Sequence, residues 1–244
     1  MMKSSLLSIA VVLIISVALF ASATSAQKPA TEKFKHAIER SEDAARLMSL
    51  LAEPNSGFPK ELIDKAQIVA VFPRASKQEM LLRRFLQGYG VISARQTTGW
   101  SPPAFYEFAS APRKFSGSSK ETIALILLFM NKDAESWFEK DKSEFKGDHA
   151  GMLGRVGVLA EEQLTQMASA QIVAFTYYNG TLNGNRIDPD FFKDFILDQD
   201  NNINLPLYGG KGYEVLTGKK IDSASIPPGV PAFQEALQKC CPAR

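Results

Sequence analysis

The chain has few of the residues that most enzymes and metal proteins use for chemistry. Its 244 residues include two histidines, His36 and His149, and two cysteines, Cys240 and Cys241. Asp148 precedes His149 and could form an acid-base pair with it, but no nucleophile motif such as G-x-S-x-G accompanies them. A disulfide between two adjacent cysteines cannot link distant segments of the fold, and two thiols alone make an incomplete zinc site. We therefore predict a non-enzymatic protein without metal or cofactor, held together by its core.

A calcium loop is also only partly present. Asn and Asp residues alternate at the spacing of the first EF-hand ligands, at Asp198, Asp200, Asn202 and Asn204. An EF-hand then needs glycine at the sixth position and a bidentate glutamate at the twelfth, where this chain has Ile203 and Gly209. We interpret the segment as a solvated acidic loop.

The chain lacks a large net charge. Its net charge therefore favours no class of binding partner. Lys plus Arg number 28 against 26 Asp plus Glu, for a formal net charge of +2. The distribution is uneven, because residues 74–120 are mainly basic and residues 188–200 mainly acidic. The basic stretch contains Arg74, Lys77, Arg83, Arg84, Arg95, Arg113, Lys114 and Lys120. Such a chain has two faces of opposite charge if each segment forms one surface.

Long apolar runs are absent after the first residues. Lys3 precedes an apolar run from Leu6 to Phe20, and the small residues ASATSA follow. This pattern predicts a signal peptide over residues 1–26, cleaved after Ala26 or Ala23, with a retained anchor as the alternative. We expect an exported protein, periplasmic or secreted, that associates peripherally with a membrane and has no nucleic-acid partner.

Periodicity and turn residues predict an α+β fold. Apolar residues spaced near 3.6 predict an amphipathic helix over 31–52, and shorter helices are expected at 60–66, 160–168 and 188–196. Strands are predicted at 68–72, ending at a proline, at 80–85 and 88–94 with a helix as the alternative, at 123–130, and at 171–178 before an Asn-Gly turn. The hairpin signals favour a single domain with an antiparallel, barrel-like sheet flanked by short helices.

Two blocks in the middle of the chain resemble a known family. GWSPPAFYEF begins at Gly99, and ETIALILLFM ends at Met130. Together they resemble the SYLF domain, a lipid-binding family in which a G-W-S-x-P-A-F-like block precedes a V-x-L-L-F-M-like strand. The strand QIVAVFP and the element Leu207-Tyr208-Gly209-Gly210 extend the likeness to about residues 31–221. The chain departs from the family at SKQEMLLRRFLQ, where small residues are usual and only Gly88-x-Gly90 matches.

The resemblance implies a lipid-binding domain over residues 27–222, followed by a proline-broken tail over 223–244. Charge and amphipathicity then predict the contact residues for anionic phospholipid headgroups at a membrane surface. In the first helix the cations are Lys33, Lys35 and Arg40, and the inserting residues are Phe34 and Ile38. The phosphate contacts beyond it are Arg83, Arg84, Arg113 and Lys114.

Two alternatives remain open at this stage. The apolar stripe of the first helix could instead pack on the sheet, and the basic residues could form a solvated face. The chain could also be a structural or interaction protein of the cell envelope, acting through a protein partner or through self-association as a homo-oligomer. Cys240 and Cys241 would support the second alternative, because their thiols can cross-link chains.

Overall fold

The computed structural model describes residue 32 and residues 34–80, 83–114, 122–183, 189–219, 221 and 226–242. The predicted signal peptide, with its cleavage sites, and Lys33 lie outside the described residues. Five residues at one end of the sheet are described by their backbone alone, namely Glu79, Met80, Arg84, Arg113 and Lys114.

The elements follow one another along the chain as short helices between strands. The helices are α2 (Lys35–Leu51), α3 (Lys60–Lys65), α4 (Glu161–Ala168), α5 (Asn201–Tyr208), α6 (Gly212–Leu216) and α7 (Ala232–Cys240), with 3-10 turns η1 (Ala134–Phe138), η2 (Gly147–His149) and η3 (Pro189–Phe192). The strands are β1 (Ile68–Met80), β2 (Arg83–Gln96), β3 (Gly99–Trp100), β4 (Ala104–Ser110), β5 (Arg113–Lys114), β6 (Thr122–Phe129), β7 (Lys142–Lys146), β8 (Gly151–Leu153), β9 (Ile172–Tyr178), β10 (Thr181–Leu182) and β11 (Asp194–Gln199).

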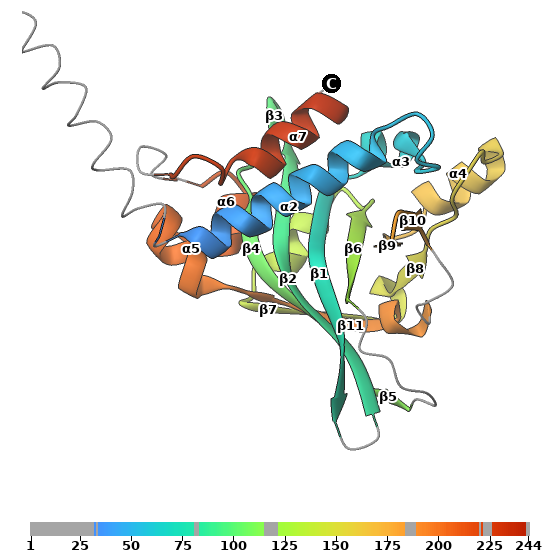
Figure 1. Cartoon of the computed structure of the whole chain (residues 1–244), viewed down its shortest axis with the longest axis horizontal. Coiled ribbons are helices and arrows are strands. Elements are labelled where there is room, and N and C mark those ends of the chain that lie inside the picture. Colours follow the sequence, from blue (N-terminus) through green and yellow to red (C-terminus); the bar gives the residue numbers. More distant parts are fainter. Residues whose placement is uncertain are drawn as a thin grey trace, which may run out of the picture.

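The strands form one strongly curved sheet. Their order is β10-β9-β6-β1-β2-β4-β11-β7, and every neighbouring pair along this path is antiparallel. The sheet is nearly closed and barrel-like, and helices flank it, with α2 lying across β1 and β2 (Figure 1). The prediction of an α+β fold with an antiparallel, barrel-like sheet and an N-terminal helix is confirmed.

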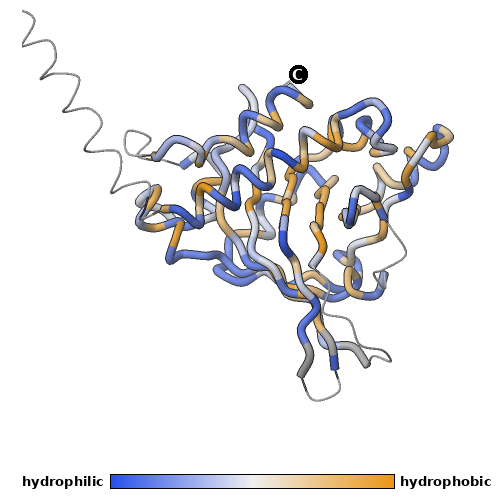
Figure 2. Tube along the Cα trace, in the orientation of Figure 1, coloured by the Kyte–Doolittle hydropathy of each residue, from blue (hydrophilic) through white to orange (hydrophobic). Residues whose placement is uncertain are grey.

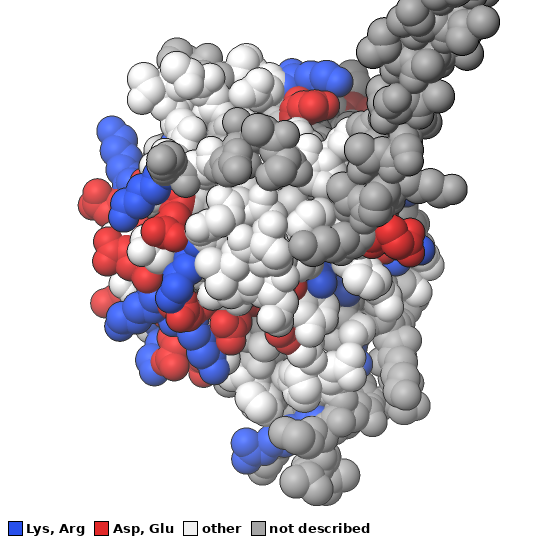
Figure 3. Space-filling view, turned by 90° about the vertical axis from the view of Figure 1, so that its left-hand side faces the viewer, with Lys and Arg blue, Asp and Glu red and all other residues white. Residues whose placement is uncertain are grey.

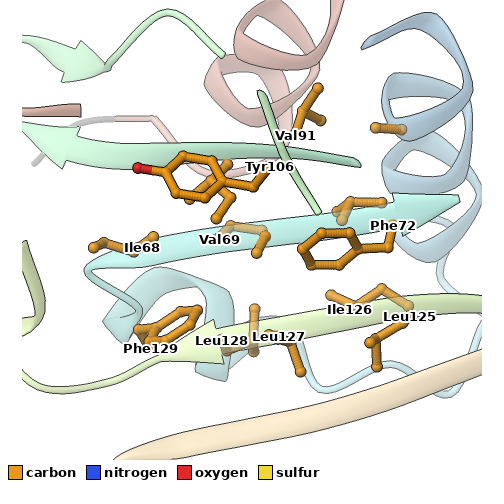
Figure 4. Packing of buried hydrophobic residues seen from close by; sticks show 14 of the residues in the cluster. Ile68, Val69, Phe72, Val91, Tyr106, Leu125, Ile126, Leu127, Leu128 and Phe129 are labelled. Atoms are coloured by element: carbon orange, nitrogen blue, oxygen red, sulfur yellow. The ribbon is translucent and has the colours of Figure 1, made fainter. Parts of the chain in front are cut away.

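Aromatic rings fill the space enclosed by the sheet. Phe72 of β1, Phe108 of β4 and Phe195 of β11 stack in sequence, with ring centroids 5.6 and 5.3 Å apart. Phe145 of β7 continues the row, 4.8 Å from Phe195, and also lies 5.6 Å from Phe129 of β6. Figure 4 shows Phe72 and Phe129 among the aliphatic side chains of β1 and β6. Rings from strands that are distant in the sheet therefore meet in one core.

The strands β1 and β6 are buried on both faces where they cross this core. Residues 68–72 of β1 are fully buried, and in β6 every residue after Thr122 is buried. Their unbroken apolar sequence fits that position, and β6 is hydrophobic along its length in Figure 2. The predicted buried strand at 123–130 is confirmed.

The C-terminal segment packs against α2. The hydroxyl of Ser41 donates to the carbonyl oxygen of Val230 at 2.6 Å, and the backbone N–H of Phe233 donates to the same hydroxyl at 3.1 Å. Phe233 and Leu237 of α7 are fully buried. The segment predicted as a tail thus covers α2, which lies between it and β1 and β2.

Three predictions of secondary structure are wrong. Pro73 does not end β1, because it lies in a β-bulge between Phe72 and Ala75, where a missing backbone N–H is tolerated. The strand continues to Met80, and the two strands or helix predicted after it form one long strand, β2. The helix predicted at 188–196 is instead η3 followed by β11, whose odd-numbered residues point into the core. Residues 184–188 lie outside the described residues.

Candidate functional site

A projecting end of the sheet carries the strongest candidate site. The pairing of β1 with β6 ends at Ser76, and the pairing of β2 with β4 ends at Gln87. Beyond these residues β1 and β2 pair with each other as far as Met80 and Arg83, and β5 pairs with β2. We call residues 76–80, 83–87 and 113–114 the basic arm; it projects from the barrel at the bottom of Figure 1.

The register of the basic arm places four cations on adjacent positions of two strands. Arg83 lies opposite Lys114, and Arg84 lies opposite Arg113. On the other side of β2, Glu79 lies opposite Arg84 and Met80 opposite Arg83. Alternate positions along a strand belong to opposite faces of a sheet, so Arg83 and Lys114 lie on one face, and Arg84, Arg113 and Glu79 lie on the other. The sequence predicted all four cations, and the register places them as two cross-strand pairs at the same end of the sheet.

Solvent reaches the basic arm. Arg83 and Gln78 are exposed, and Phe85 is half-buried. At the lower end of the molecule in Figure 3, where the arm lies, Lys and Arg atoms are exposed on the visible face. Elsewhere on that face, positive and negative atoms are intermixed.

The arm depends on a close approach of backbones at the bulge of β1. A methyl group on Gly88 would lie 2.7 Å from the Cα of Ala75, and one on Gly90 would lie 2.8 Å from the Cα of Phe72. Both glycines are in β2, opposite the point where Pro73 interrupts the register of β1. The sequence shows the two glycines as Gly88-x-Gly90. Only the strand register shows that each lies close to the backbone of β1.

Most of the lipid contacts predicted in α2 do not lie on a free surface. The guanidinium of Arg40 lies 2.7 Å from a carboxylate oxygen of Asp200 and 4.6 Å from the ring centroid of Tyr89, and its side chain is 20% exposed. Phe34 and Ile38 are half-buried and pack against the core. The structure therefore directs three of the predicted lipid contacts inward or into an ion pair, and leaves Lys35 exposed.

The outward face of α2 is not basic. Its exposed cations and acids balance, with Lys35 and Arg46 against Glu39 and Glu42. Asp43 pairs with Arg74 of β1 at 2.6 Å. An anionic surface gains little from a helix of zero net charge, so α2 serves here as a cover for the sheet.

A hollow of about 540 Å³ lies beside the start of α2. Arg40, Tyr89, Glu107, Asp198 and Asp200 are among the residues that line it, and Glu107 and Asp198 are directly opposite each other on β4 and β11. Asp200, at one of the positions that imitate a calcium loop, forms an ion pair with Arg40. Among the residues that the structure describes, no group of three or more His, Cys, Asp or Glu side chains could hold a metal ion.

The histidines lie on the surface. Asp148 and His149 are exposed on η2, and the His149 ring lies 4.6 Å from the ring centroid of Trp137. His36 is exposed on α2, with Nδ1 3.4 Å from a carboxylate oxygen of Glu39. Neither arrangement places an acid-base pair in an enclosed site.

Comparison with known proteins leaves the family assignment as a prediction. No model of a known protein family matches the chain, and no curated protein matches it. Within the described ranges, no helix has both the length and the apolar composition needed to cross a bilayer. The resemblance to SYLF domains therefore rests on the sequence blocks given above.

Proposed function

We propose that this protein binds anionic phospholipid headgroups at a membrane surface, without catalysing a reaction, and that the basic arm makes the contact. The observation that carries the proposal is the cross-strand register of Arg83, Arg84, Arg113 and Lys114 at an end of the sheet that projects from the barrel. Arg presents a planar fork of donors to phosphate, and Lys a compact charge.

The expected strength follows from the charge count. The four cations of this register, together with Glu79, carry a formal net charge of about +3, and Lys77, the fifth cation of the arm, is buried. Each cation near an anionic membrane contributes about 1 kcal/mol, so the arm contributes about 3 kcal/mol, or roughly a hundredfold in affinity. Binding also relieves the repulsion between the paired cations.

In this proposal α2 is a structural element and not the inserting helix. Its apolar side is occupied by α7 and by the sheet, and its exposed charges balance. Phe34 and Ile38 would have to leave the core in order to enter a membrane. The predicted signal peptide supports an exported protein that meets a membrane from outside the cytoplasm.

Vesicle flotation across a salt series tests the proposal. The purified protein is mixed with neutral vesicles or with vesicles containing an anionic phospholipid. The arm variant replaces four cations by glutamine, at Arg83, Arg84, Arg113 and Lys114. A matched control replaces four exposed cations on α2 and α3, at Lys35, Arg46, Lys60 and Lys65.

We expect binding to anionic vesicles alone, weakened as salt shortens the Debye length from about 8 Å at 0.15 M to about 3 Å at 1 M. The arm variant loses four cations at about 1 kcal/mol each, so its affinity should fall by nearly a thousandfold, whereas the control should stay close to the native protein. Equal loss in both variants would refute the arm as the contact. Full competition by inorganic phosphate would identify a soluble phosphate ligand, and no flotation under any condition would reject lipid binding.

A further inference from the structure

The end of α7 holds two thiols side by side. The sulfur atoms of Cys240 and Cys241 lie 2.8 Å apart, and the Cys240 sulfur also lies 3.5 Å from the carbonyl oxygen of Leu237. Cys240 is half-buried, whereas Cys241 is 2% exposed. Lipid binding by the basic arm makes no use of this pair.

The same turn attaches α7 to the sheet. The indole N–H of Trp100 donates to the carbonyl oxygen of Cys241 at 2.9 Å, inside the core. The guanidinium of Arg95 lies 4.3 Å from the Trp100 ring centroid and donates to the carbonyl oxygen of Pro242 at 3.4 Å. The backbone N–H of Cys241 donates to Leu237 at 2.8 Å, which is the last hydrogen bond of the helix.

We propose that Cys240 and Cys241 are a redox-active pair that closes to a vicinal disulfide on reaction with an external disulfide, and that closure loosens the attachment of α7 to Trp100. The Cys240 thiolate attacks one sulfur of the external disulfide and releases one thiolate, leaving a mixed disulfide. Cys241 then gives up its proton, attacks the Cys240 sulfur and releases the second thiolate. Two electrons pass from the protein to the external disulfide, which becomes two thiols.

The surroundings of the sulfur atoms favour this order of attack. The hydrogen bond with the Cys241 thiol lowers the pKa of Cys240, while the same hydrogen bond and, after it, burial raise the pKa of Cys241. The half-buried sulfur is therefore also the one that ionises more easily, and the thiolate is the attacking species. Cys241 is placed to resolve the mixed disulfide, because its sulfur is already in contact with that of Cys240.

Ring closure must disturb the backbone at this turn. Consecutive Cα atoms are about 3.8 Å apart, below the range of about 4.4–6.8 Å that disulfides usually span. The peptide between Cys240 and Cys241 must therefore twist, which weakens the hydrogen bond from the Cys241 N–H to Leu237. Movement of Cys241 also draws its carbonyl oxygen away from Trp100. A bond formed under such strain is readily reduced, so the change is reversible.

Oxidised glutathione is the probe that tests the pair. The full-length protein is treated with it and digested with trypsin, which cleaves after Lys239 and releases residues 240–244 as one peptide. We expect this peptide to lack two hydrogen atoms and to carry no glutathione. In a Trp137→Phe background the emission of Trp100 should shift to longer wavelength on oxidation and return after reduction.

Single substitutions separate the two sulfur atoms. Cys241→Ser should accumulate a stable glutathione adduct on Cys240, whereas Cys240→Ser should remain unmodified. Recovery of the two-thiol peptide as free thiols, as a glutathione adduct or as a cross-link between chains would overturn the proposal. An internal disulfide that forms without any change in Trp100 emission would overturn the loosening of α7.

Discussion

Gly90→Ala tests whether the close approach of β1 and β2 shapes the sheet. A methyl group on Gly90 would collide with the carbonyl oxygen of Val71 and would lie 2.6 Å from Cδ1 and 2.8 Å from Cα of Phe72. Two of these three atoms belong to the backbone of β1, which is paired on its other side with β6. The strand cannot move aside without disturbing the core, so the substitution should destabilise the fold.

The magnitude follows from two opposing effects. Overpacking a core costs about 1–3 kcal/mol, and the backbone contacts at Gly90 place it at the upper end. Replacing glycine by alanine also restricts the unfolded chain, which stabilises the fold by about 0.4–1 kcal/mol. We therefore expect a net loss of about 2–3 kcal/mol in the free energy of unfolding.

Urea unfolding followed by circular dichroism measures this loss. With a slope near the upper end of about 1–3 kcal/mol/M, the midpoint should fall by about 1 M. Gly210→Ala is the matched control, because its methyl group would meet only side-chain atoms of Glu214, the nearest at 3.2 Å, and no backbone atom of a neighbouring strand. Equal midpoints for the two variants would refute the argument that backbone contact at Gly90 limits the residue to glycine.

Four further outcomes follow from buried polar groups. The Tyr106 hydroxyl has no hydrogen-bond partner among the described residues, so Tyr106→Phe should leave thermal stability equal or higher. Tyr208→Phe should lose about 1 kcal/mol, because that hydroxyl donates to a carbonyl at 2.8 Å. Burial, with a smaller effect of Asp141, raises the pKa of Tyr106. Stability measured by urea unfolding should therefore fall as pH rises above about 10, and less steeply in Tyr106→Phe. Asn204→Leu should cost about 2–4 kcal/mol, because it leaves a buried backbone N–H unpaired, whereas exposed Asn202→Leu should cost little.

The sequence predicted the elements whose signal is local. The apolar run at 123–130 and the helices at 60–66 and 160–168 agree with β6, α3 and α4, because periodicity and flanking turn residues are read within a few positions. The prediction of a helix at 188–196 was wrong because that segment has no decisive local signal. Its aromatic residues fit either period, and pairing with β4 and β7 decides that the segment is a strand.

For the candidate site, too, the sequence and the tertiary structure give different information. Charge alone identified Arg83, Arg84, Arg113 and Lys114, but only the strand register shows that they occupy neighbouring positions. Charge also identified Arg40, whose partner Asp200 is 160 residues away in the sequence. A charge is visible in a sequence, whereas its neighbours depend on contacts made when distant segments pack together. The sequence by itself therefore determined the fold class and the cations available, and the tertiary structure decided which of them lie at neighbouring strand positions and which, like Arg40, form ion pairs within the fold.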